Sequence, residues 1–81
     1  MDKNFSLMIK RKGETSFALH SEPVATYIPR IGEKVELNID NTGYIFEITD
    51  IIYPLSELAN VAEIYAVEVA TTTEYLSLLN T

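Results

Sequence analysis

Residues 34–53 form two apolar-rich segments joined by a turn, and this pattern constrains the fold more than any other feature of the chain. The first segment alternates polar and apolar side chains in the order Lys34, Val35, Glu36, Leu37, Asn38 and Ile39. Such period-two alternation is typical of a β-strand with one wet and one dry face. Residues 44–53 are more apolar and predict a longer returning strand. The stretch therefore predicts a β-hairpin.

The sequence predicts the position of the turn in this hairpin and of one bulge. Residues 40–43, with the sequence Asp-Asn-Thr-Gly, predict the turn, and the glycine is expected at a positive φ that closes a type I turn plus bulge. In the returning strand, Asp50 falls where a core residue is due. A bulge at Thr49-Asp50 would turn Asp50 outward and return Ile51 or Ile52 to the core face.

The rest of the chain predicts further short strands and one helix. Alternation predicts strands over residues 5–11, 15–20 and 63–70, with a short edge strand over residues 24–28. Thr71 and Glu74 have the spacing of a capping box, and the leucines that follow predict a short C-terminal helix. We expect these leucines to cover an open barrel end or to contact a partner. The whole chain, residues 1–81, is expected to form a single mainly β domain of about five strands.

The middle third of the chain resembles a known family. Residues 29–37, Pro-Arg-Ile-Gly-Glu-Lys-Val-Glu-Leu, and residues 43–48, Gly-Tyr-Ile-Phe-Glu-Ile, are similar to segments of small SH3-like β-barrel proteins. Many proteins of that kind are encoded by phages and other mobile elements. The resemblance, over residues 29–48, implies a small antiparallel SH3-like barrel or open sheet and a mobile-element origin. It carries over no catalytic residue.

Charge is distributed unevenly along the chain, whose formal net charge is −6. Residues 1–34 hold all six lysines and arginines, whereas residues 35–81 hold eight acidic residues and no base. An anionic half of this kind suits docking on a basic protein surface, such as the channel of a nucleic-acid enzyme. We expect the partner-binding acidic face to consist of Glu36, Asp40, Glu47, Glu63 and Glu68.

The composition indicates no cofactor or metal. With no cysteine and one histidine, the chain lacks the usual zinc ligand sets and any disulfide framework. Nothing at the N-terminus resembles a signal peptide, and no apolar run approaches the roughly 20 residues that span a bilayer. We therefore expect a cytoplasmic protein that does not bind membranes.

Catalysis is not expected. His20 is followed by Ser21 and Glu22, but neighbours along a strand point to opposite faces and cannot form a triad. Three glycines in all provide no phosphate-cradling loop. A pair of carboxylates on neighbouring strands, of the kind that glycosidases use, is still an open alternative. A solvated polar face is, however, the ordinary result of alternation.

The main hypothesis is a non-catalytic acidic protein that binds and inhibits or adapts a basic protein partner, as phage inhibitors of host defence do. A hydrophobic content of 47% is high for so small a chain and indicates either an oligomer, which we expect, or a packed monomer with some exposed apolar side chains. We expect Ile45, Ile51, Ile64 and the C-terminal leucines to form the self-interface.

Two alternatives involve phosphate groups. An oligomeric sponge would hold a small phosphorylated nucleotide signal through Arg11, Tyr27, Arg30 and Lys34.

The second alternative is nucleic-acid binding. Lys10, Arg11 and Lys12 form a basic cluster, and aromatic side chains such as Tyr44 and Phe46 would stack on bases. A sequence pI near 4.5 argues against it, because the protein as a whole repels phosphates.

Overall fold

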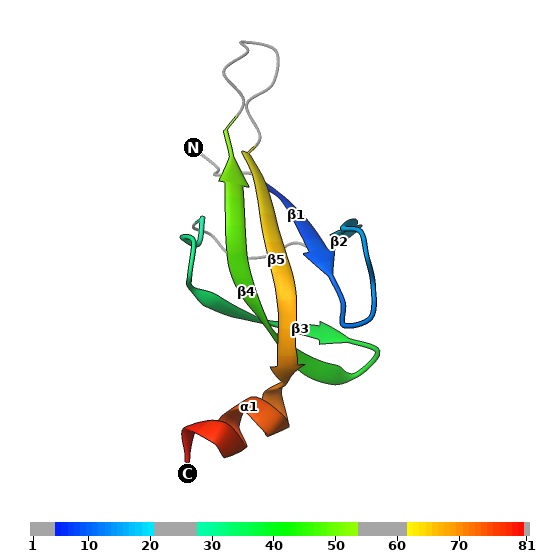
Figure 1. Cartoon of the computed structure of the whole chain (residues 1–81), viewed down its shortest axis with the longest axis vertical. Coiled ribbons are helices and arrows are strands. Elements are labelled where there is room, and N and C mark those ends of the chain that lie inside the picture. Colours follow the sequence, from blue (N-terminus) through cyan, green and yellow to red (C-terminus); the bar gives the residue numbers. More distant parts are fainter. Residues whose placement is uncertain (1–4, 21–27, 54–61, 81) are drawn as a thin grey trace.

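The chain forms five strands and one helix in a computed structural model that describes residues 5–20, 28–53 and 62–80. The elements are β1 (Phe5–Lys10), β2 (Ala18–His20), β3 (Lys34–Ile39), β4 (Thr42–Ile52), β5 (Ala62–Thr71) and α1 (Thr72–Leu79). The strands make one sheet in the order β2-β1-β5-β4-β3, which curls into a half-barrel (Figure 1). The predicted mainly β fold with a C-terminal helix is confirmed. Of the edge strand predicted over residues 24–28, residues 24–27 lie outside the described residues, and Ile28 is not in a strand.

One pair of strands departs from the predicted antiparallel arrangement. β1 runs parallel to β5, with Leu7 opposite Ile64 and Ile9 opposite Ala66. The other three neighbouring pairs are antiparallel. Alternation along a strand specifies which side chains face the core, but it does not specify the neighbour or its direction.

The core lies on one face of the curled sheet. Phe46, Ile48 and Ile64 are fully buried, and other apolar side chains from β1, β3 and β5 surround them. Burying each such large side chain contributes roughly 1.5–3 kcal/mol. The expectation that Ile64 belongs to a self-interface is therefore wrong, and Ile51 likewise packs against this core.

Two bulges bend the long strands. In β4, Ile48 pairs with Ala66 and Asp50 with Tyr65, so Thr49 is the extra residue. Asp50 is exposed while Ile51 returns to the core, which confirms the predicted bulge. A second register shift, between Ile45 and Phe46, was not predicted.

The turn between β3 and β4 differs from the expected one. Ile39 pairs with Thr42, so the turn has two central residues, Asp40 and Asn41, with φ values of 52° and 67°. Positive φ at both positions is typical of a type I′ turn, whose twist matches that of the flanking strands, and Asp and Asn tolerate it. Gly43 lies within β4 opposite Asn38, and the prediction that it closes the turn is wrong.

The capping box at the start of α1 is confirmed. Thr71 Oγ1 accepts a hydrogen bond from the backbone N–H of Glu74 at 3.1 Å, and Glu74 Oε1 accepts one from the Thr71 N–H at 3.0 Å. None of the helical residues is buried, and Leu76, Leu78 and Leu79 are more than half exposed. The helix lies beyond the end of β5 (Figure 1), and the exposure of these leucines contradicts the expectation that they cover an open barrel end.

Two turns share the sequence Arg-x-Gly-Glu, a repeat that alternation does not reveal. In residues 11–14 and again in residues 30–33, the glutamate N–H donates to the arginine carbonyl at 3.0 Å. In both turns the glutamate Oε1 accepts from the arginine N–H at 2.8 Å. The glycines have φ values of 87° and 93°, the conformation that the third position of a type II turn requires. Glu14 and Glu33 therefore hold their own turns.

Candidate functional site

Acidic and aromatic side chains meet on the face of the sheet opposite the core, which we call the outer face. Asp50 on β4 lies directly opposite Tyr65 on β5, and Glu63 precedes Tyr65 by two residues on the same face. Asp50 and Glu63 are exposed, whereas Tyr65 is half-buried. With Phe17, these residues define the outer patch: Phe17, Asp50, Glu63 and Tyr65.

The phenol of Tyr65 is hydrogen-bonded to one of the two carboxylates. Its hydroxyl donates a hydrogen bond to Glu63 Oε1 at 3.2 Å. Partial burial raises the pKa of Tyr65, and the hydrogen bond to Glu63 and the negative charges of Glu63 and Asp50 raise it further. The phenol is therefore protonated at neutral pH and keeps the hydroxyl that donates to Glu63.

Phe17 contacts the Tyr65 ring. The two rings meet edge to face, with centroids 5.1 Å apart and planes at 87°, a favourable aromatic geometry. The ammonium group of Lys10 lies 5.2 Å from the Phe17 centroid. The patch thus already accommodates one cation above an aromatic ring.

The five acidic residues predicted as one face are distributed over several places. Glu36 accepts a hydrogen bond from the Thr72 hydroxyl at 2.7 Å, and Glu47 lies 3.7 Å from the Lys34 ammonium. Asp40 occupies the β3–β4 turn. Of the predicted set, only Glu63 belongs to the outer patch.

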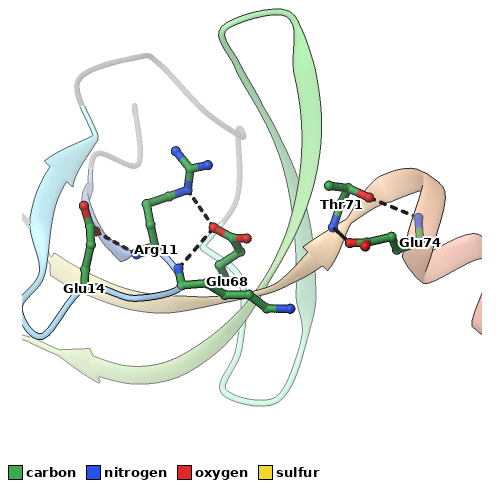
Figure 2. Close-up of polar contacts among 6 residues, drawn as sticks. Arg11, Glu14, Glu68, Thr71 and Glu74 are labelled. Carbon is green, nitrogen blue, oxygen red and sulfur yellow. Dashed lines mark hydrogen bonds and ion pairs between the residues drawn. The ribbon is translucent and has the colours of Figure 1, made fainter.

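Glu68 faces the opposite side of the sheet, because it lies across from the buried Phe46. Its Oε1 accepts from Arg11 Nε at 2.7 Å and from the Lys12 N–H at 3.3 Å (Figure 2). Its side chain is only 9% exposed. Glu68 is therefore an internal partner of Arg11, and the prediction that it shares a solvated acidic face with Glu63 is wrong.

Arg11 is likewise occupied. Its guanidinium carbon lies 4.2 Å from the centroid of the Tyr44 ring, and the hydrogen bond to Glu68 is the main cause that raises the pKa of Arg11. Of the other residues predicted for a nucleotide ligand, Arg30 and Lys34 are exposed, and Tyr27 lies outside the described residues.

Two other candidates change with the structure. Phe46 is fully buried, so the prediction that it stacks on nucleic-acid bases is wrong. His20 is half-buried at the end of β2 opposite Leu7, and its neighbours Ser21 and Glu22 lie outside the described residues. Within residues 5–20, 28–53 and 62–80, no group of three histidines or carboxylates is placed to hold a metal ion.

Sequence reasoning missed three members of the outer patch. Asp50 could have been predicted, because the expected bulge already turned this residue outward. The contact between Phe17 and Tyr65 could not have been predicted, because it depends on β1 lying between β2 and β5.

Comparison of the chain with protein-family models, with curated proteins and with solved structures finds no match. In the described part of the chain, no helix has the length and apolarity to cross a bilayer. A functional conclusion therefore rests on the geometry of the chain itself.

Proposed function

We propose that the chain is a non-catalytic binding module whose outer patch receives a lysine or arginine side chain from a basic protein partner. The observation that carries the proposal is that two carboxylates lie next to Tyr65: Asp50 lies directly across from it on β4, and Glu63 on β5 accepts its hydroxyl hydrogen bond. A cationic head group would lie between the two carboxylates, while its aliphatic stem would lie along the aromatic rings.

The charge of the surrounding surface supports this proposal. The segment from residue 35 onward is wholly anionic, so its field attracts basic partners before contact. The neighbouring strands β1 and β3 each contribute one lysine. Lys10 of β1 lies over the Phe17 ring, and Lys34 of β3 lies near Glu47. Neither of them pairs with Asp50 or Glu63 in the contacts of the described residues.

Binding of this kind would inhibit or adapt the partner. A protein with a net charge of −6 that occupies a basic channel competes with the polyanion that normally enters it. The two carboxylates of the patch are exposed on the outer face of the sheet, and its two aromatic residues are half-buried, which suits recognition of a protein surface better than enclosure of a substrate.

A nuclear magnetic resonance titration tests the proposal with a synthetic peptide of alternating lysine and arginine as the probe. We expect the largest amide shifts in residues 47–52 and 63–67, and binding that weakens as salt is added. Shifts centred on the Arg30–Glu33 turn or on α1, or no saturable shifts at low salt, would contradict it.

A further inference from the structure

β3 is the longer of the two edge strands in the described sheet. It has six residues and pairs only with β4 in the described sheet, without a register shift. The opposite edge, β2, has only three residues, and short edge strands resist pairing with other chains. β3 contains no proline, so each of its residues retains a backbone N–H.

The hairpin determines which backbone groups of β3 are free. Ile39 and Thr42 flank the two-residue turn and form its hydrogen-bonded pair, and at the other end Ile48 N–H donates to the Glu33 carbonyl at 2.9 Å. Because such pairs alternate along an antiparallel ladder, the odd-numbered residues of β3 bond to β4. Lys34, Glu36 and Asn38 therefore direct their N–H and C=O groups toward the free edge.

We propose that a second copy of this chain pairs with β3 in antiparallel orientation about a two-fold axis at Leu37. In this register Glu36 lies opposite Asn38 of the second copy, so a carboxylate meets an amide donor, and Lys34 lies opposite Asp40. Each polar pair occurs twice because the contact is isologous. On the core side, half-buried Val35 and Ile39 lie opposite each other and shield one another from water.

The other registers are less favourable. An axis at Glu36 places this carboxylate opposite its own copy, and an axis at Asn38 places Glu36 opposite Asp40, so both bring like charges together. An axis at Val35 pairs only residues 34–36, because the chain bends in the Arg30–Glu33 turn. The axis at Leu37 pairs the whole strand with complementary side chains.

The pairing is independent of the proposed function. It joins two half-barrels edge to edge through β3, whereas the outer patch is formed by β4, β5 and Phe17. Both copies would therefore keep this patch open.

Analytical ultracentrifugation of the full chain and of two variants at one exposed position tests the proposal. Wild type is expected to reach twice its monomer mass of 9.1 kDa. In Asn38→Lys, the new lysine of each copy would lie opposite Glu36 of the other, which creates two ion pairs. We expect them to lower the dimer dissociation constant by about two- to thirtyfold. Asn38→Glu would face the same carboxylate and raise the constant by a similar factor.

A third variant tests the edge itself. Glu36→Pro removes an N–H that β4 does not use, and we expect a monomer whose far-ultraviolet circular dichroism retains the wild-type strand signal. Glu36→Gln keeps that N–H and is expected to dimerise. A wild-type monomer up to about 1 mM would overturn the proposal. So would a dimer that is indifferent to both Asn38 changes, or one that Asn38→Glu strengthens.

Discussion

The guanidinium of Arg11 and the carboxylate of Glu68 form an ion pair of 2.7 Å although 57 positions separate them in the sequence. The parallel pairing of β1 with β5 brings them together, because Lys10, the last residue of β1, lies opposite Val67, and Arg11 and Glu68 follow these two residues in the sequence. The pair lies beside Tyr44 on the core side of the sheet and links the start of the β1–β2 turn to β5.

Loss of the Glu68 carboxylate should destabilise the fold. Glu68→Ala leaves Arg11 and the Lys12 N–H without their acceptor, and Arg11 is 29% exposed, so we expect a loss of about 1–2 kcal/mol in the free energy of unfolding. Glu63→Gln on the exposed outer face should change it by less than about 0.5 kcal/mol. Urea denaturation measures both. Equal effects of the two changes would show that the Arg11–Glu68 pair contributes nothing.

The stability of α1 should depend on acid pH. The backbone N–H of Thr71 is the main cause that lowers the pKa of Glu74. Because the folded-state pKa is lowered, the ionised Glu74 stabilises the folded helix fully above the ordinary carboxyl pKa, about 4.3. This stabilisation is lost as the pH falls through the folded-state pKa. The protection of the α1 amides from hydrogen exchange, relative to unstructured amides at the same pH, should therefore fall in acid. In Glu74→Gln this acid-dependent step should disappear, and its persistence would assign it to another group.

Gly43 should not tolerate a larger side chain, for a steric reason. A Cβ at this position would lie 2.7 Å from Glu36 Oε2 and 2.8 Å from Thr72 Oγ1, the two atoms of one hydrogen bond. We expect Gly43→Ala to displace that bond and to cost about 1 kcal/mol of unfolding free energy. In a Thr72→Ala background the same change should cost less, as a double-mutant cycle by thermal denaturation would measure. Equal costs in both backgrounds would exclude this contact as the cause.

The turn residue Asn41 should tolerate glycine but not alanine. Its φ of 67° lies in the left-handed region, which penalises most side chains by roughly 1–2 kcal/mol and spares glycine. We therefore expect Asn41→Ala to lower the melting temperature and Asn41→Gly to leave it unchanged or raised. If alanine were as stable as glycine here, the two-residue turn would be wrong.

The features that sequence reasoning predicted correctly are those that a local pattern specifies. Alternation predicted the hairpin and the Thr49 bulge, because an acidic residue at a core position requires a change of register. The Thr71–Glu74 spacing predicted the cap. Each of these depends on side chains only a few residues apart.

The features that it missed depend on contacts between distant segments. The parallel neighbour of β1 could not be read from alternation, and neither could the ion pair that this neighbour creates. Gly43 was misassigned because Asp and Asn also adopt positive φ, so a shorter turn was available. At the candidate site, Asp50 was predictable from its bulge, but its meeting with Tyr65 and Phe17 required the strand order.

The most direct test of the outer patch is the affinity of two matched double variants for the lysine–arginine peptide, measured by isothermal titration calorimetry. Asp50→Asn with Glu63→Gln removes two charges from the patch, and Glu14→Gln with Glu33→Gln removes two exposed charges elsewhere while keeping the acceptor oxygen of each turn. Exposed ion pairs contribute about 0.2–1 kcal/mol each, so we predict a two- to thirtyfold loss of affinity for the first variant and a smaller loss for the second. Equal losses in both, or none in the first, would contradict the assignment of binding to Asp50, Glu63 and Tyr65.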